Sequence, residues 1–440
     1  MDNLPSEWAS ATVGEICEYL QRGKTPRYAE FSSLPVINQK CIRWTGIQAE
    51  HLKFIHPDQI SEWPKEKFIK NGDILLNSTG TGTLGRACLV TLNDSMPGKV
   101  VDSHVTIIRV NIGIAHPKFV FYWFKGPTMQ RLIDELSTGT TNQIELNRST
   151  ISGIVIPLAP ISDQEYIVEK LDGLLSCTQL GLEHVEKLLS TCRRLKQTII
   201  LAAIRGTLYQ STSEESQCEQ VINVEEPYKH SIHGPKNWNG FLLGDVCALE
   251  GGSQPPKSTF SSLKSDDYVR LIQIRDYKSD RYVTYIPRSL ARRFCNSKDI
   301  MIGRYGPPIF QILRGLEGAY NVALMKVIPK CELVSEEYLY YFLQNEVLLR
   351  FVEAGSERTA GQDGVRKELV LNYPIFLPSI EEQERIAALI KNSLDRLTNI
   401  ETKIMNAKTM ITELPSSILA QAFSGKFKQT GKRVTAKTLK

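Results

Sequence analysis

The sequence predicts an α+β fold with a pseudo-two-fold internal repeat, in which two mixed, strand-rich domains are separated by two long antiparallel coiled-coil helices. Three observations support this fold class. Two distant parts of the chain share one pattern of residues. Each copy ends in a long segment whose apolar residues alternate at spacings of three and four, as in a coiled coil. The rest of each copy alternates short β-rich runs with turn residues and short helical stretches.

The repeat is clearest where each copy enters its helical part. The segment "LAPISDQEYI" (158–167) matches "LPSIEEQERI" (377–386) at an offset of 219, and the same offset relates Gly206 to Gly425. A constant offset over this length indicates a duplicated unit with no net insertion there. The two copies also begin alike, with "WASATVGEICEYL" at 8–20 and "WNGFLLGDVCALE" at 238–250.

Strand-like and helical runs fill the mixed part of each copy. The helical runs are "PKFVFYWFKG" (117–126) and "EEYLYYFLQNEVLLRFV" (336–352). The strand-like runs are rich in β-branched and aromatic residues and are bounded by turn residues. They are "PVINQKCIRW" (35–44), "VTIIRVNIGI" (105–114), "YVRLIQI" (268–274), "RYVTYIP" (281–287) and "NVALMKVI" (321–328).

The long helix of the first copy is expected to begin near Ser162, a good N-cap residue, with Glu165 at the third helical position. A helix from there to Arg205 would be roughly 60 Å long. We expect it to pack antiparallel to its counterpart and to hold the two mixed domains apart. The predicted seam residues lie at 171, 175, 178, 182, 185, 189 and 192, and at Leu397, Ile400, Ile404, Ala407, Ile411, Leu414 and Ile418.

These patterns define the expected domain boundaries. They are a first mixed domain (1–160), a central long helix (161–210), a polar, acidic linker (211–234), a second mixed domain (235–378), a distal long helix (379–425) and a basic tail (426–440).

Composition narrows the class of protein. A chain of 440 residues is long enough for two or three domains. No apolar run reaches the roughly 18 residues of a membrane span, and the first residues do not resemble a signal peptide. The nine cysteines form no CxxC pair, which argues against a zinc site and for a reducing, cytoplasmic location. The net charge of +5 comes from the basic tail, so it does not indicate that the rest of the chain binds nucleic acid.

The stretch "GDILLNSTGTGTLGRACLV" (72–90) contains Gly80-x-Gly82-x-x-Gly85, the spelling of a dinucleotide-binding turn. That turn requires a helix directly after its last glycine, because the helix N-terminus holds the pyrophosphate. Here "CLVTL" follows, which favours a strand. We therefore interpret the stretch as a Gly/Thr-rich loop between two strands and keep a nucleotide-cofactor enzyme as a weaker alternative.

Two similar but non-identical domains suit a two-part target such as duplex DNA, whose phosphates repeat while its bases differ. The segment from Tyr268 to Phe294 is rich in basic residues with tyrosines between them. Arg and Lys can neutralise phosphates or read guanine, and Asn and Gln can read adenine. The amides of the glycine loop can approach a phosphate closely. The candidate DNA-binding residues are Gln39, Lys40, Arg43, Thr79, Thr81, Thr83, Arg86, Thr140, Asn142 and Gln143 in the first copy, and Lys257, Arg275, Lys278, Arg281, Arg304, Tyr305, Gln311, Arg314, Thr359 and Gln362 in the second.

Four duplicated motifs then allow a family to be named. They are "GDILLNSTGTGTLGRA", "GRYGPP…GAYNVALMKVIP", the two helix entries of the form P-x-x-x-Q-E and the helix exit "AFSGKF". Their order along the chain resembles that of a DNA specificity (S) subunit of a type I restriction–modification system. The resemblance covers nearly the whole chain. The helix entries vary in detail, since Pro160 and Pro378 do not align at the common offset.

This resemblance implies two target-recognition domains that each read one half of a bipartite, asymmetric double-stranded DNA site. The long helices would set the gap between the halves and bind two modification methyltransferase subunits, and restriction (translocase) subunits would join that core. The resemblance implies no catalysis, metal or cofactor in this chain. S-adenosylmethionine would sit on the methyltransferase, and ATP and Mg on the restriction partner.

Other functions stay open at this point. The chain has neither the [DNS]-P-P-[YFW] motif of adenine-N6 methyltransferases nor a GxxxxGK[ST] loop. A recognition component of a simpler methyltransferase–nuclease system would share these features. A coiled-coil adaptor with two protein-binding heads is a further alternative.

Overall fold

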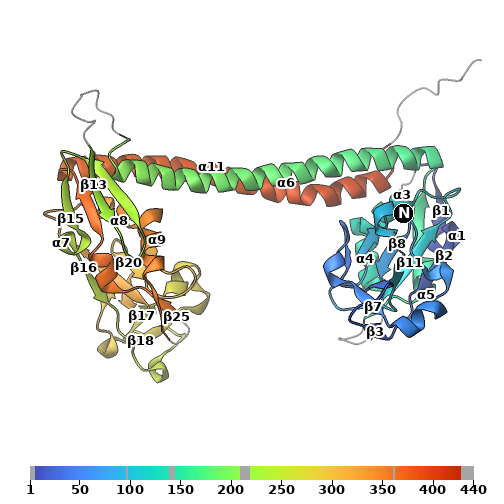
Figure 1. Ribbon diagram of the computed structural model, residues 1–440, viewed down its shortest axis with the longest axis horizontal. Helices are drawn as coiled ribbons and strands as arrows, with labels where there is room; N and C mark the ends of the chain where they lie inside the picture. The colour runs from blue at the N-terminus through green and yellow to red at the C-terminus, as the bar shows by residue number, and fades with distance from the viewer. Residues whose placement is uncertain (1–4, 96–97, 138–143, 209–218, 360–361, 428–440) are drawn as a thin grey trace, which may run out of the picture. The chain divides into compact units, whose positions relative to one another are not determined.

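The computed structural model describes residues 5–95, 98–137, 144–208, 219–359 and 362–427. The chain divides into two compact units (Figure 1), residues 1–186 with 405–440, and residues 187–404. Both units mix strands with short helices, as expected for an α+β fold. The division falls inside the two long helices and not at their ends, so each unit contains part of both helices.

The first unit is built on two four-stranded sheets, with strand orders β2-β11-β8-β9 and β10-β4-β7-β3. Strands β10 and β4 pair in parallel, and the pairs β1–β12 and β5–β6 are antiparallel. The strands are β1 (Ala9–Thr12), β2 (Cys17–Arg22), β3 (Tyr28–Ala29), β4 (Pro35–Ile37), β5 (Ile42–Arg43), β6 (Gly46–Ile47), β7 (Lys53–Ile55), β8 (Ile74–Asn77), β9 (Ala87–Leu89), β10 (Val100–Val101), β11 (Val105–Val110) and β12 (Val155–Leu158). The short helices are α1 (Val13–Ile16), α2 (Leu92–Ser95), α3 (Pro117–Lys125), α4 (Pro127–Leu136) and α5 (Arg148–Gly153).

The second unit repeats this plan, with sheets β16-β23-β20-β21 and β18-β17-β22-β19. The interval expected to be a linker contains the hairpin β13–β14. The strands are β13 (Glu219–Val224), β14 (His230–Pro235), β15 (Asn239–Leu242), β16 (Cys247–Gly251), β17 (Tyr268–Ile272), β18 (Tyr285–Pro287), β19 (Phe294–Cys295), β20 (Ile300–Gly303), β21 (Gln311–Leu313), β22 (Gly318–Tyr320), β23 (Leu324–Pro329), β24 (Glu357–Thr359), β25 (Gln362–Gly364) and β26 (Pro374–Leu377). The short helices are α7 (Leu243–Val246), α8 (Glu336–Leu343), α9 (Glu346–Ala354) and α10 (Lys367–Leu371).

The internal repeat is confirmed by the matching strand order. The sheet β16-β23-β20-β21 has the connectivity of β2-β11-β8-β9, and β15–β26 pair as β1–β12 do. The parallel pair β17–β22 corresponds to β4–β10. The two copies also share a hydrogen bond near their starts. The amide of Trp8 donates to the Pro5 carbonyl, and the amide of Trp238 donates to the Pro235 carbonyl.

Apolar runs form the core strands because both of their faces are covered. Every residue of β8 and β11 is buried. Helix α3 begins with Pro117 after the N-cap residue His116, as its sequence favours. The expected single run over 336–352 is instead two helices, α8 and α9. The break arises because Asn345 accepts a hydrogen bond from the Leu348 amide and so caps a new helix.

The long helices are α6 (Ile161–Ile204) and α11 (Ile380–Phe423), each of 44 residues (Figure 1). Helix α6 begins one residue before the expected N-cap position. In the first unit, Gly181 lies against Ile411 and Glu186 pairs with Lys408. Because the partner number falls as the α6 number rises, the two helices run antiparallel there. In the second unit, Lys196 forms an ion pair of 2.5 Å with Glu401.

The predicted seam of α6 is confirmed, since its positions from 171 to 192 are buried or half-buried. The predicted seam of α11 is shifted by one residue in places. Ile400 and Leu414 are exposed, whereas Glu401 and Pro415 are half-buried. The sequence pattern counted only apolar residues, whereas the half-buried Glu401 and Lys408 form ion pairs with Lys196 and Glu186 of α6.

A buried glutamine fixes the start of each long helix to its own unit. Gln164 accepts a hydrogen bond from the His116 amide and donates to the carbonyls of Ala159 and Ile114. Gln383 makes the equivalent bonds to the backbone of Ser335, Pro378 and Leu333. Both side chains are fully buried. The glutamine of the P-x-x-x-Q-E motif is therefore a structural anchor, because its amide satisfies three backbone groups at once.

Candidate nucleic-acid interface

The glycine-rich loop of the first unit joins two antiparallel strands. Strand β8 ends at Asn77, and β9 begins at Ala87 and pairs back against it. All three glycines have positive φ, between 76° and 107°, as a tight loop requires. The helix that a dinucleotide-binding turn needs does not follow Gly85. The weaker alternative of a nucleotide-cofactor enzyme using this loop is therefore wrong in its structural premise.

The amides of this loop bind the protein itself. The N–H groups of Gly80, Thr83, Leu84, Gly85 and Arg86 all donate to backbone carbonyls. The Thr83 hydroxyl donates to the carbonyls of Thr79 and Gly80, and the Arg86 guanidinium donates to that of Gly82. These bonds hold the loop in shape, and the expected contact of the loop with a phosphate stays a prediction.

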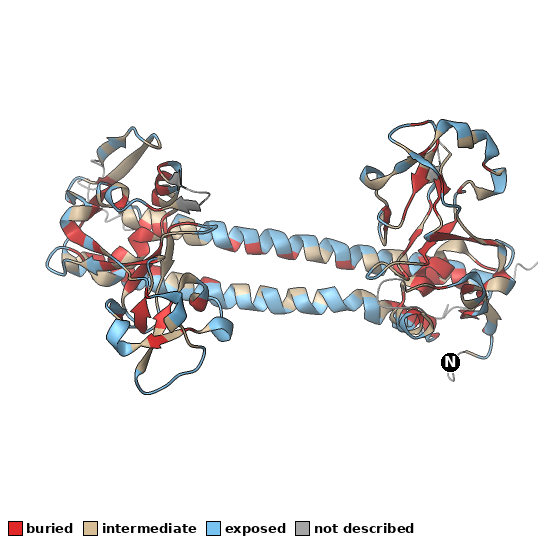
Figure 2. Cartoon of the chain, turned by 90° about the horizontal axis from the view of Figure 1, so that it is seen from below, coloured by how far each residue is buried: buried red, intermediate tan, exposed pale blue. Residues whose placement is uncertain are grey.

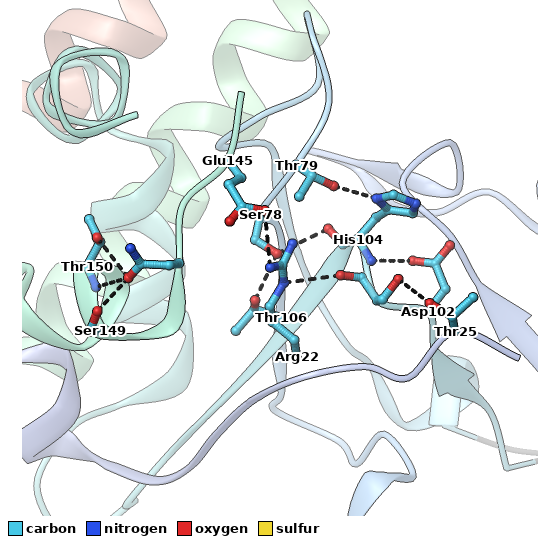
Figure 3. A network of polar contacts seen from close by, with 12 residues as sticks. Arg22, Thr25, Ser78, Thr79, Asp102, His104, Thr106, Glu145, Ser149 and Thr150 are labelled. Carbon is cyan, nitrogen blue, oxygen red and sulfur yellow. Dashed lines mark hydrogen bonds and ion pairs between the residues drawn. The ribbon is translucent and has the colours of Figure 1, made fainter. Parts of the chain in front are cut away.

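A hollow of about 480 Å³ lies beside the loop, lined by Arg22, Gly23, Gln39, Thr79, Gly80, Ser103, His104, Ile144 and Glu145. The Thr79 hydroxyl lies 2.6 Å from His104 Nδ1, and Arg22 reaches Glu145 Oε2 at 3.4 Å (Figure 3). Arg22 Nε also donates to the Ser103 carbonyl. Figure 3 shows side chains of separate strands and loops directed into this region. The hollow is thus a polar cleft that offers both donors and acceptors, and we call it the first cleft.

Asp102 supports the floor of the first cleft. Its Oδ1 accepts a hydrogen bond of 2.9 Å from the His104 amide, and the Tyr28 hydroxyl lies 3.4 Å from its Oδ2. Burial raises the pKa of the Asp102 carboxyl, and the His104 amide and the nearby Lys53 charge offset only part of this. The equivalent residue of the second unit is Asn321, whose Oδ1 accepts from the Ala323 amide in the same way.

We expect Asp102→Asn to be at least as stable as the parent at pH 7. A raised native pKa means that the folded state binds more protons than the unfolded state, so the parent loses stability as pH rises from the usual aspartate pKa of about 3.9. The asparagine removes this loss and keeps the acceptor, as Asn321 does. Thermal unfolding followed from pH 4 to 7.5 should show the advantage of the variant shrinking toward low pH. The exposed Asp134→Asn is the control, and a variant less stable than the parent at pH 7 would contradict the expectation.

The candidates of the first copy occupy different places. Gln39 and Thr79 line the first cleft. Lys40 and Thr81 are exposed nearby, whereas the Arg43 guanidinium donates to the carbonyl of Lys40 and is turned to its own strand. Thr140, Asn142 and Gln143 lie outside the described residues.

The candidates of the second copy also lie in different surroundings. Lys257, Arg275, Lys278 and Arg281 are exposed, and both arginines lie near the Tyr282 ring. Arg304 lies 5.3 Å from the centre of the Tyr305 ring. Gln311 donates to the Pro308 carbonyl. Arg314 pairs with Glu337 and Glu336 and lies over Tyr340, an arrangement that favours a structural role. Thr359 and Gln362 pair across the β24–β25 hairpin.

Sequence reasoning did not single out Arg22, Ser103, His104 or Glu145. These residues come from the end of β2, the turn before β11 and the segment after residue 143, so no local spacing connects them. Only the tertiary fold brings these positions together.

Two absences can be stated for the described residues alone. No helix among them is both long enough and apolar enough to cross a membrane. Within the same ranges, no cluster of three or more His, Cys, Asp or Glu side chains is arranged to hold a metal ion.

The chain thus holds two copies of one strand-rich framework, each with a loop at the same place in its sheet. The family model described as "Type I restriction modification DNA specificity domain" matches residues 5–188 and again 235–408. The chain belongs to this family.

Curated relatives agree with the family. The EcoKI specificity subunit of Escherichia coli (strain K12) is 22% identical over 450 residues, covering 96% of this chain and 89% of the relative. The EcoBI specificity subunit of Escherichia coli is 24% identical over 305 residues, which is 66% of this chain. That alignment spans 62% of EcoBI, less than two thirds of its length.

Solved structures share the fold. A chain from a structure of complex assembly and conformational transition of the type I R-M system gives a TM-score of 0.71 at 19% identity, covering 96% of this chain and 98% of the other. The HsdS subunit from Thermoanaerobacter tengcongensis gives 0.58 at 20% identity, with the same coverage.

Proposed function

We propose that this chain is the sequence-specific DNA-binding subunit of a type I restriction–modification complex, and that each unit recognises one half of an asymmetric, bipartite site. The match of one specificity domain to both units carries this proposal. Two units with one framework and different surface side chains would read two different sequences. Phosphate contacts would position the units, and base contacts would specify the site.

The long helices are the proposed docking surface for partner subunits. Leu174, Leu188 and Leu195 are 38%, 52% and 43% exposed, and their spacings of seven and fourteen residues place them on one stripe of α6. Figure 2 shows how much of both long helices is exposed. An apolar stripe on a solvent-facing helix suits a helical partner. We assign it to two modification methyltransferase subunits, with restriction subunits joining the assembly.

The chemistry is proposed to belong to those partners. This chain would bind the site and place a methyltransferase over its adenine, which that enzyme flips out of the stack. S-adenosylmethionine would be held by the methyltransferase, and ATP and Mg by the restriction subunit.

Mapping of methylated adenines tests the proposal. The full chain is expressed with its methyltransferase partner in a host that lacks other adenine methylation. A single bipartite motif with a fixed internal gap is expected. Exchange of residues 235–375 for the equivalent part of another family member should change one half of the motif and leave the other. Methylation or binding without sequence preference would overturn the proposal, and binding to proteins alone would favour the two-headed adaptor.

A matched insertion in both long helices should widen the gap between the half-sites. Four residues added in α6 near Leu189 and four in α11 near Ile404 lengthen each helix by about 6 Å, close to two base-pair steps of roughly 3.4 Å. We expect the preferred gap to grow by one or two base pairs while both half-sites stay the same. The same four residues inserted in the turn between β13 and β14 are the control. An unchanged gap in the helix variant would contradict the spacer role.

A further inference from the structure

The backbone framework around the first cleft recurs in the second unit, which identifies equivalent positions residue by residue. Three backbone hydrogen bonds of the first unit recur in the second unit, and their residues numbered above 100 are related by the offset of 219. The bond from Gly23 N to Val105 O matches that from Gly252 N to Leu324 O. The bond from Ser78 N to His104 O matches that from Arg304 N to Ala323 O. The bond from Leu146 N to Ser78 O matches that from Val365 N to Arg304 O. The bridges Thr79–Glu145 and Tyr305–Gly364 also match.

Glycines fix the close approach on which this framework depends. A Cβ on Gly23 would lie 2.2 Å from the carbonyl oxygens of Val101 and Asp102. A Cβ on Gly252 would lie 2.0 Å from that of Asn321, the equivalent of Asp102. The same crowding in both units shows that the backbone beside Gly23 and Gly252 has one arrangement.

The side chains that line the first cleft differ from their equivalents in the second unit. The register of the paired strands and bridges gives these matches. Arg22 corresponds to Gly251, Gln39 to Ile274, Thr79 to Tyr305, His104 to Ala323 and Glu145 to Gly364. A polar cleft in one unit is thus replaced by an apolar and aromatic surface in the other. Different side chains at equivalent places of a shared framework are the pattern expected where two copies recognise different targets.

Gln39 is the side chain with an unused hydrogen-bonding group. Its Oε1 is buried and has no hydrogen-bond partner among the described residues. The side-chain amide of Gln39 lies directly beside Gly80, since a Cβ added to Gly80 would be 2.6 Å from Oε1. A buried amide oxygen without a partner costs free energy, so an incoming donor would be bound strongly. Thr79 engages His104 Nδ1, which leaves Nε2 on the outer edge of that exposed ring.

We propose that Gln39 and His104 form the base-reading pair of the first unit and that Gln39 reads an adenine. This assignment rests on the proposed function. Gln39 Oε1 accepts from the adenine N6 amino group, in the pairing that the major-groove edge of adenine offers to glutamine. His104 lines the same cleft, and its Nε2 would bond to the same or the adjacent base pair. The corresponding Ile274 and Ala323 offer no hydrogen bond, so the second unit must read its half-site with other groups.

Gln39→Ile, which introduces the residue of the second unit, tests the assignment in the full chain with its methyltransferase partner. The expected result is a relaxed preference at one adenine-containing position of one half-site. A good base contact gives about 5- to 150-fold discrimination, and this preference should be lost there. The other half-site in the same molecule is the internal control. His104→Ala should relax the same or the adjacent position.

Gln39→Glu keeps an acceptor at the same place but removes the amide donor. Because carboxylates accept from the cytosine N4 amino group, the preferred base should move from adenine toward cytosine at that position. Thermal unfolding of both variants checks that the unit is intact.

The outcomes separate this assignment from the proposed function. If the unmodified complex yields no bipartite motif, the proposed function fails. If it yields one and folded Gln39 variants keep the same motif, the base-reading assignment alone is overturned. A change in the other half-site, or a uniform loss of methylation without a change of preference in folded variants, also overturns it.

Discussion

Replacing Arg109 with Met is expected to lower the free energy of unfolding of the first unit by about 3–5 kcal/mol, because it leaves a buried carboxylate without its partner. The Asp73 side chain is fully buried, and Arg109 Nε and Nη2 each lie 2.7 Å from one of its oxygens. This bidentate pair joins the start of β8 to the end of β11. In the second unit Asp299, the equivalent of Asp73, pairs with Lys326 at 2.7 Å, whereas the position equivalent to Arg109 is Ile328.

A double-mutant cycle measures this interaction. The double variant Asp73→Asn/Arg109→Met should recover at least half of the loss, since the asparagine is neutral and still accepts from the Lys70 amide, as Asp73 does. The exposed pair Arg27–Asp58 is the matched control in the same unit, and Asp58→Asn should cost less than about 1 kcal/mol. Denaturant unfolding gives the free energy of unfolding of all four members of the cycle, which are the parent, the two single variants and the double variant. Equal costs for the buried and the exposed pair would refute the expectation.

Gln383→Leu is expected to lower the free energy of unfolding of the second unit by about 2–4 kcal/mol. The leucine has a similar volume, but it leaves the Ser335 amide and the carbonyls of Leu333 and Pro378 without their partner in a buried place. The start of α11 should therefore loosen from the unit. Amide hydrogen exchange should show lost protection at Ser335 and in the first turns of α11.

The control for Gln383 is Gln179→Leu on the exposed face of α6. That glutamine bonds only to Glu183 among the described residues, so its replacement should change stability by no more than about 0.5 kcal/mol. Gln164→Leu should behave like Gln383→Leu in the first unit. Comparable small effects at Gln383 and Gln179 would show that the buried anchor does not stabilise the helix start.

The sequence predicted features that depend on local periodicity. The repeat offset, the α6 seam and the strand after Gly85 all follow from residue types at short spacing, and the structure confirms them. The α11 seam was misplaced at Ile400 and Leu414, next to which Glu401 and Pro415 are half-buried. Glu401 pairs with Lys196 of α6, and a pattern that counts only apolar residues misses a charged residue in the seam.

The candidate site was less predictable, because a residue type does not reveal its partner. Arg314 and Arg86 carry charges that suit DNA, yet the structure shows them bonded to Glu337 and to the Gly82 carbonyl. The first cleft needs Arg22, His104 and Glu145 from three distant segments, which only the tertiary fold brings together. Gln39, a candidate from the sequence, lines the first cleft two residues after the end of β4.

The composition of the first unit has a consequence for how the protein is made. The Phe423 ring packs tilted and edge-on against those of Phe119 and Trp123, so two segments far apart in the sequence complete one core. The second unit consists of residues 187–404, a single continuous stretch. On the ribosome, this unit can finish folding as soon as residue 404 has emerged. The first unit keeps an open apolar surface until the segment that carries Phe423 has been made.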